Sequence, residues 1–474
     1  MTERRETILR GLGVAALAAP MVALAVLRAA PELDPKIMAF GFHFYVVGFT
    51  ALAAAVACGV VIASARTLQN TRLLFLGLAF FAIAGIFSVH GLATPGFIHE
   101  EYYASVAVSG WLSAFAGSAF AALSVVGLPR RAEHIVERNG RAFFAAAAAL
   151  VFTYIALSFT AETWLNWVPI RNLNFRLALG LTSLALSGFA IWRYYQAYLF
   201  ARLPSQLAMV ATLILLAEVQ ALILWGGAWH LSWWLYHGLY GVAFAVLFAG
   251  WALEARRAGT LRAIADALSM RDALAQLNRG LEAPILELVD AVEAKDQETF
   301  GHVRRVSGHA LAIGRRLGLS ASDLRSLVLA AEMHDVGKIS IPSSILAKPG
   351  PLTDEEFAVV KTHTFRGDEI AQQVAALRAQ ASVIRHHHEH YDGAGYPDGL
   401  AGEDIPLYAR IIGVADAYDA MTSRRPYRDG RSHDEALAEI RSNRGSQFDP
   451  RCVDAFLAVF QEPGARDAAA ELAA

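Results

Sequence analysis

The stretch Glu332-Met-His-Asp-Val-Gly-Lys338 places a histidine beside an aspartate within an apolar run of helical character. A neutral imidazole and a carboxylate are both ligands of divalent metals, and the second carboxylate oxygen can bridge to another ion. Taken alone, such a pair is typical of side chains that cap or bridge helices. Nine of the 15 histidines lie between His302 and His433, which favours a metal site. The further candidate ligands are Glu298, His302, His363, His387, His388 and Asp416.

Hydrophobic residues make up 55% of the 474 residues, which is too high for a soluble protein. The excess lies before about Leu253, where apolar runs reach membrane-spanning length, while the rest of the chain has the mixed charge of a soluble domain. A net charge of -2 argues against a nucleic-acid partner. Cys58 and Cys452 lie in different halves of the chain, so no disulfide framework is expected.

We expect eight membrane-spanning helices in residues 1–253. The arginine clusters between them fall on one side, which the positive-inside rule makes the cytoplasm, so both termini are expected there. The first run follows Arg4 and Arg5 and also fits a signal peptide, whose removal would leave seven spans. The expected spans start near Leu12, Met38, Leu73, Tyr103, Phe143, Arg176, Ser205 and Leu231.

Residues 254–285 predict an amphipathic helical linker. Its apolar stripe can pair two chains into a parallel dimeric stalk, which we favour, or pack on the domain that follows. Pro284 must begin a new helix or kink the old one. The stripe, which extends into the next domain, consists of Met270, Leu274, Leu277, Leu281, Ile285, Leu288 and Val292.

The domain over residues 286–465 keeps a helical periodicity and shows no convincing alternation of the kind that strands have. The whole chain is therefore predicted to be all-α. Thr353-Asp-Glu-Glu356 is typical of a capping box at a helix start. The expected helices cover residues 303–317, 324–333, 354–375, 383–388, 407–421 and 433–443.

Five motifs follow one another in this domain. They are His334-Asp-Val-Gly-Lys338, residues 345–356, His386-His-His-Glu389, Asp392-Gly-Ala-Gly-Tyr-Pro-Asp-Gly399 and residues 415–427. Together they resemble the HD-GYP family of bacterial phosphodiesterases, over roughly residues 286–462. The resemblance implies a helical HD-superfamily fold, two or three divalent ions of iron or manganese, and hydrolysis of the second messenger cyclic di-GMP to pGpG or GMP. The protein would then lie in the inner membrane of a bacterium, with its catalytic domain in the cytoplasm.

The resemblance also assigns the metal ligands. Glu298, four residues before His302 and on the same helix face, resembles the extra carboxylate of family members that hold a third metal. We therefore expect three ions. The other assigned ligands are His302, His334, Asp335, His363, His387, His388 and Asp416.

The chemistry of phosphodiester hydrolysis is consistent with these residues. A phosphodiester is anionic, so hydrolysis needs cations that lower the pKa of bound water and neutralise charge on the phosphorus oxygens. Asp335 can bridge two ions, and Lys338, one turn further on, can stabilise the transition state or protonate the leaving oxygen. A tight glycine loop can set Tyr396 against a guanine, and two arginines can hold phosphates. The expected substrate contacts are Gly395, Tyr396, Pro397, Arg425 and Arg428.

Two rival functions remain open. A degenerate domain could bind a cyclic dinucleotide and signal by contact, but no ligand position is lost. Alternatively, the membrane half could be a transporter with the HD domain as its regulatory valve, although only Glu218 and Gln220 offer polar groups within the spans. The expected partners are cyclic di-GMP, membrane lipid, a second copy of the chain and diguanylate cyclases.

A second group of histidines lies in the expected outer half of the membrane region. Ionisable groups at membrane depth are costly and usually face a cavity or a partner. They favour a metal, haem or another small ligand as the signal that the membrane domain senses. The alternative is that these histidines hydrogen-bond lipid headgroups or neighbouring helices. The candidate sensory residues are His43, His90, His237 and Glu218.

Overall fold

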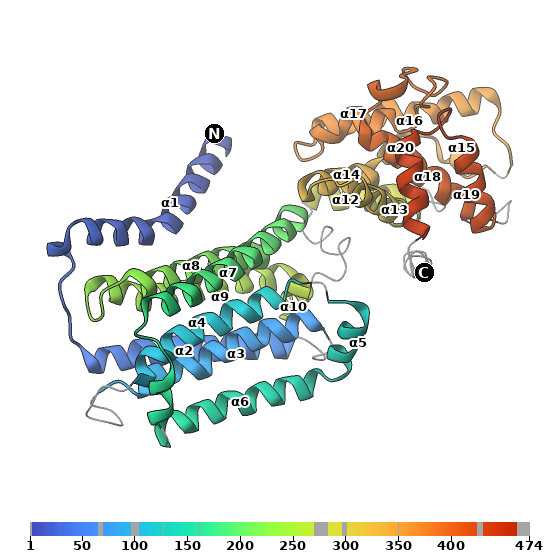
Figure 1. The fold of residues 1–474 in the computed structure, drawn as a ribbon. Coiled ribbons are helices and arrows are strands. Elements are labelled where there is room, and N and C mark those ends of the chain that lie inside the picture. The colour runs from blue at the N-terminus through green and yellow to red at the C-terminus, as the bar shows by residue number, and fades with distance from the viewer. Residues whose placement is uncertain are drawn as a thin grey trace. The chain divides into compact units, whose positions relative to one another are not determined.

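The protein is described by a computed structural model, in which every regular element of the described residues is a helix. The described residues are 2–64, 70–95, 104–126, 128–160, 162–269, 283–295, 301–348, 350–423 and 430–461. The chain divides near residue 271 into two compact units, drawn in blue to yellow-green and in yellow to red (Figure 1). The all-α prediction is therefore confirmed for both halves of the chain.

The first unit contains seven described helices that are long and apolar enough to cross a membrane. The expected first span corresponds to α1 (Thr2–Ala29), whose described apolar part, Ala15–Ala29, is shorter than these seven. The seven helices are α2 (Phe40–Ser64), α3 (Thr71–Leu92), α4 (Ala104–Leu123), α6 (Gly140–Thr160), α7 (Leu173–Ala201), α8 (Pro204–Trp225) and α9 (Leu231–Ala258). Seven of the eight expected spans thus satisfy the length and hydropathy criteria among the described residues.

Helices α2, α3 and α4 pack side by side, and α9 contacts both α2 and α8 (Figure 1). Small residues allow this close packing, as they commonly do between membrane helices. A Cβ added to Gly250 in α9 would lie 2.1 Å from the Cβ of Ala208 in α8. Aromatic side chains fill the interior, where the Phe80 ring meets those of Phe244 and Trp251.

The end of α9 is followed by a sharp break rather than by a continuous stalk. Gly259 adopts a left-handed conformation with φ of 69°, which favours glycine, and ends the helix. The next helix, α10 (Arg262–Ser269), packs against α2, α3, α8 and α9 and buries Ile264 and Leu268. Residues 270–282, which include most of the predicted linker stripe, lie outside the described residues. The last three residues of the stripe, Ile285, Leu288 and Val292, pack into the core of the second unit, as the alternative predicted. Pairing of two chains through the rest of the stripe stays a prediction.

The second unit is a bundle of short helices. The six predicted helices are all present, with ends that differ by a few residues at most. Two further helices, α15 and α20, were not predicted, and α20 packs against α13 and α18 in the core. The helices are α12 (Ala283–Lys295), α13 (His302–Arg316), α14 (Ala321–Met333), α15 (Ser343–Leu346), α16 (Asp354–Gln373), α17 (Ala381–His386), α18 (Leu407–Thr422), α19 (His433–Ser442) and α20 (Pro450–Gln461), with short 3-10 turns that include η4 (Val336–Ser340).

Local sequence sets the start of several of these helices. The predicted capping box at Thr353 is confirmed, because the Thr353 side chain accepts from the Glu356 backbone and the Glu356 carboxylate accepts from the Thr353 backbone. Ser432 and Glu435 form the same arrangement at the start of α19. Each box satisfies two amide groups that a helix start leaves without partners.

Two hydrophobic clusters hold the helices of the second unit in place. One lies between α13, α14, α18 and α20 and includes Val306, Ile411 and Phe456. The other joins α12, α14, η4, α16 and α17. Between the clusters, η4 approaches α16 so closely that a Cβ on Gly337 would lie 1.9 Å from the carbonyl oxygen of His363. Glycine is required there because any side chain would separate η4 from α16.

Replacing Gly337 with alanine tests this close approach. We expect Gly337→Ala to lower the stability of the second unit by about 1–3 kcal/mol, the usual cost of overpacking a well-filled interior. Differential scanning calorimetry of the full-length protein in detergent measures the change. The control is Ser343→Ala, because Ser343 is exposed. Equal transition temperatures for the two variants would show that α16 can shift away from η4 without loss of stability.

Candidate metal centre

Seven candidate ligands from five different helices or helix ends lie close together in the second unit. His302 begins α13, and His334 and Asp335 occupy the break between α14 and η4. Because the chain changes direction there, the side chains of both neighbouring residues reach the interior of the unit. The remaining four are His363 of α16, His387 and His388 at the end of α17, and Asp416 of α18.

Asp335 lies between the other side chains. Its Oδ2 atom is 3.3 Å from Nε2 of His334 and 4.0 Å from Nε2 of His302. Its Oδ1 atom faces the opposite way, 3.5 Å from Nε2 of His363. The ammonium group of Lys338 lies 2.7 Å from Oδ2. The two oxygens of one buried carboxylate therefore face two different sets of imidazoles.

Three of the histidines are fixed by the same hydrogen bond. The Nδ1 atoms of His334, His363 and His387 each donate to the carbonyl oxygen three residues earlier, at 2.7 Å. This places the proton of each neutral ring on Nδ1 and leaves the Nε2 lone pair available. A metal-binding histidine usually has its other nitrogen anchored in this way.

The donor atoms form two triplets, each with all donors within 4.8 Å of one another. One consists of His363, His387 and His388, and the other of His302, His334 and Asp335. Nε2 of His334 is buried without a hydrogen-bond partner, which is costly unless a cation occupies the site. Imidazole and carboxylate donors with a shared carboxylate fit two divalent transition-metal ions.

Burial and charge set the protonation of these groups. Burial raises the pKa of Asp335, but Lys338 and the neighbouring histidines outweigh it and hold that pKa well below its usual range. Burial lowers the pKa of His388 to about 4. Burial also holds the pKa of His387 well below its usual range, and the other imidazoles add to the effect. An ionised carboxylate and neutral imidazoles are the forms that bind metals.

His302 is held differently from the other histidines. Its Nε2 lies 3.3 Å from Asp416, and its Nδ1 lies 2.7 Å from Oδ2 of Asp419. Burial lowers the pKa of His302, but the two aspartates outweigh it and raise the pKa to about 10. A metal at His302 must therefore displace a proton.

Asp419 was missed by the sequence analysis, which singled out only Asp416. It is almost fully buried and accepts from both His302 and Arg305, with Nε of Arg305 at 2.5 Å. The signal that could have identified it is its spacing, because Asp419 lies three residues after Asp416 and so on the same face of α18. Asp419 orients a candidate ligand rather than acting as one.

The glycine and tyrosine loop borders the same centre. The Tyr396 ring lies 4.9 Å from the His388 ring, and a cavity beside them is lined by His388, Tyr396 and Asp416 among others. Gly395 is required by close packing, because a Cβ there would lie 2.2 Å from the backbone nitrogen of His390. Pro397 follows Tyr396 in the same loop. The predicted site residues Glu298, Arg425 and Arg428 lie outside the described residues.

Comparison with known families identifies this unit. Residues 288–452 match the sequence model of the family described as "HD domain". The C-terminal unit is an HD domain. Its curated relatives and its Gly-Tyr-Pro loop agree with the predicted resemblance to the HD-GYP family.

Three relatives of the HD domain show the range of the family. The chain is 47% identical over 172 residues to the cyclic di-GMP phosphodiesterase response regulator RpfG of Xanthomonas campestris, covering 36% of this chain and 46% of the relative. It is 39% identical to a probable cyclic di-GMP phosphodiesterase of Vibrio cholerae, covering 38% and 45%. It is 36% identical to the 3'3'-cGAMP-specific phosphodiesterase 2 of the same organism, and the match covers 38% of this chain and 34% of the relative. The chain thus spans about half the length of the first two relatives and about a third of the length of the third.

The role of Asp419 behind His302 is testable through metal content. We expect Asp419→Asn to lower metal affinity about 10–100-fold, because a partner that orients a ligand typically has that effect. Elemental analysis of the full-length protein, after dialysis against graded chelator concentrations, measures it. Asp404→Asn serves as the control, since Asp404 is exposed. Identical metal retention in both variants would assign Asp419 a structural role alone.

Proposed function

We propose that the chain is a membrane-anchored, metal-dependent phosphodiesterase that hydrolyses cyclic di-GMP. The observation that carries this proposal is the arrangement of two donor triplets around Asp335 in an HD domain. The curated names of its relatives supply the substrate class, since several are cyclic di-GMP phosphodiesterases. The membrane anchor is inferred from the seven long apolar helices.

The residues proposed to hold metal ions are the two triplets and Asp416. Glu298 is proposed as a ligand of a third ion. Divalent ions bound there, which the resemblance gives as iron or manganese, would supply a nucleophilic water at neutral pH and neutralise phosphate charge. Asp335 would serve both triplets, because each of its oxygens already faces one of them.

The protein's own groups position the substrate around this centre. Lys338 is hydrogen-bonded to Asp335 and keeps 21% of its side chain exposed, so its ammonium group can also reach a phosphate at the edge of the centre. Donation from this ammonium would stabilise charge on a phosphate oxygen or protonate the leaving oxygen. Tyr396, beside His388, offers a ring face to a guanine base.

The two rival functions are less well supported. A domain that only binds the nucleotide would not need to retain seven convergent ligand positions. A transporter would require polar pairs within the spans, and Glu218 is only half-buried, with one carboxylate oxygen that has no hydrogen-bond partner among the described residues. The predicted cytoplasmic orientation, the dimer and an association with diguanylate cyclases remain part of this proposal.

The full-length protein, purified in detergent and loaded anaerobically with iron or manganese, tests the proposal. It is given cyclic di-GMP, cyclic di-AMP and 3'3'-cGAMP separately, and the products are followed by chromatography. Hydrolysis of cyclic di-GMP at the highest kcat/KM supports the proposal. A preference for 3'3'-cGAMP would give the protein the substrate specificity named for its 3'3'-cGAMP-specific relatives. Absence of any hydrolysis would favour the binding-only function.

Substitution of Asp335 tests the centre directly. We expect Asp335→Ala to reduce kcat at least about 1,000-fold while circular dichroism stays helical, since loss of a shared ligand removes most of what a metal contributes. Asp404→Ala is the matched control, because it removes an exposed carboxylate. Turnover above a tenth of the wild-type rate would refute the assignment of Asp335.

Substitution of Glu298 tests the number of ions. Glu298→Gln should lower the metal content by about one ion per chain without emptying the site, because it removes a carboxylate that only the third ion needs. Elemental analysis gives the stoichiometry. Unchanged metal content would instead indicate a two-metal enzyme.

A further inference from the structure

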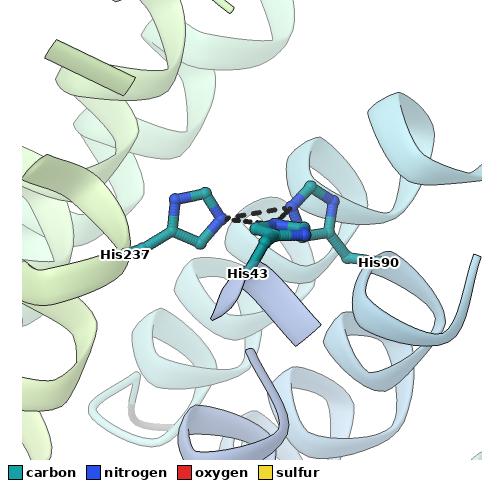
Figure 2. A group of neighbouring side chains, drawn as sticks. All are labelled: His43, His90 and His237. Carbon is teal, nitrogen blue, oxygen red and sulfur yellow. Dashed lines mark hydrogen bonds between the residues drawn. The ribbon is translucent and has the colours of Figure 1, made fainter. Parts of the chain in front are cut away.

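Three fully buried histidines from distant parts of the chain meet in the first unit. His43 lies in α2, His90 in α3 and His237 in α9, and each is at most 3% exposed. Figure 2 shows their rings converging with the Nε2 atoms at the centre. The Nε2 atoms of His43 and His237 are 2.9 Å apart, those of His43 and His90 3.1 Å, and those of His90 and His237 3.3 Å.

The other nitrogen of each ring already has an acceptor. Nδ1 of His90 donates to the carbonyl oxygen of Val106 at 2.6 Å, and Nδ1 of His237 donates to that of Trp233 at 3.2 Å. Nδ1 of His43 lies 2.8 Å from the hydroxyl of Thr94, whose own proton goes to the carbonyl oxygen of His90. All three neutral rings therefore carry their proton on Nδ1.

This arrangement leaves three Nε2 lone pairs facing one another. Three acceptors in mutual contact repel, and burial prevents water from relieving them. The Tyr236 hydroxyl, 3.1 Å from Nε2 of His90, can donate to one of the three at most. A cation at the centre would satisfy all three lone pairs together.

We propose that His43, His90 and His237 form a binding site for a late first-row transition-metal ion, zinc or copper. Imidazole nitrogens bind such ions at about 2.0–2.1 Å, which in a tetrahedral site places donors about 3.3–3.4 Å apart. The observed separations of 2.9–3.3 Å need only a small adjustment to reach that value. Three histidines with a fourth position left open are a known zinc arrangement.

The chemistry of the surroundings selects the class of ion. The grouped donors are nitrogens without a carboxylate, which disfavours magnesium and calcium. The short distances between nitrogens leave no space for a macrocycle between the rings, which disfavours the haem considered from sequence. The Phe87 ring stacks on His90 with centroids 5.0 Å apart, and the Trp233 ring lies 4.2 Å from His237, so the site is enclosed by aromatic side chains.

Glu218, the fourth sensory candidate, does not belong to the grouped donors. His230, a further histidine of the first unit, pairs its Nδ1 with the carbonyl oxygen of Asp34 at 2.6 Å and is not grouped with them either. The site joins the start of α2, the end of α3 and the first third of α9. A bound ion would tie these three helices together at one end of the bundle, whatever reaction the HD domain catalyses.

Tryptophan fluorescence allows the site to be tested in the full-length protein. All nine tryptophans precede residue 252, so their emission reports the first unit and not the HD domain. The protein in detergent, stripped with chelator, is titrated with copper(II), which quenches nearby indoles. We expect quenching that saturates at no more than about four equivalents per chain, because the stripped HD centre can take up to three ions as well, and that is prevented by prior addition of zinc at the same ratio. Quenching that keeps rising beyond this ratio would overturn the proposal, and this needs no variant.

Variants locate the ion. His237→Gln should require at least about 10-fold more copper for half-maximal quenching, as loss of one ligand weakens a metal site strongly. The control is His134→Gln, because His134 is an exposed histidine of α5 (Arg130–Arg138) and should titrate as wild type. Zinc-loaded wild type should also hold one more zinc per chain than the triple variant with His43, His90 and His237 changed to Gln. Equal titrations of His237→Gln and wild type, or equal zinc contents, would refute the site.

Discussion

The hydrogen bond that anchors one nitrogen of each imidazole is the interaction on which both sites depend. In the HD domain it runs from Nδ1 to a carbonyl oxygen three residues earlier, and His334, His363 and His387 all make it. In the first unit Nδ1 of His90 donates to the carbonyl oxygen of Val106 in α4, and Nδ1 of His237 donates to that of Trp233, four residues earlier. Because the anchor fixes both the tautomer and the direction of the ring, the Nε2 lone pairs face one another within each group of donors.

Close approach of backbones brings these anchored rings together. Gly337 lets η4 lie against α16, which carries His363 next to Asp335. Gly395 likewise allows close backbone packing in the loop that brings the Tyr396 ring next to that of His388. In the first unit, Gly91 follows His90 directly, and a Cβ there would lie 2.9 Å from Val47 of α2. Small residues at these points determine how near the helices that carry the histidines can come.

The two sites differ in how they balance charge. The HD centre contains Asp335 and Asp416, whose negative charges are offset by Lys338 and His302, and it suits ions that bind an anionic phosphate. The three histidines of the first unit bring no charge of their own. An ion there would keep its full positive charge in an apolar setting, which favours a tightly bound ion in a structural or sensing role over one that exchanges ligands during catalysis.

The sequence by itself determined what depends on local chemistry. Hydropathy identified the long apolar helices, periodicity identified the helices of the HD domain, and Thr353 with Glu356 marked a capping box, because each of these signals is contained in a few neighbouring residues. The ordered motifs around His334 and Asp335 were likewise sufficient to predict the family.

Only the tertiary structure decided which side chains meet. Three contacts depend on helix packing. Asp335 faces imidazoles of both triplets, Asp419 supports His302 across 117 residues of chain, and His43 meets His237 across 194 residues. Sequence spacing carries no information about such contacts, because the angle and depth at which two helices pack are set by the side chains between them. The sequence therefore grouped three membrane-region histidines and Glu218 as candidates, and packing brought the three histidines to one point without Glu218.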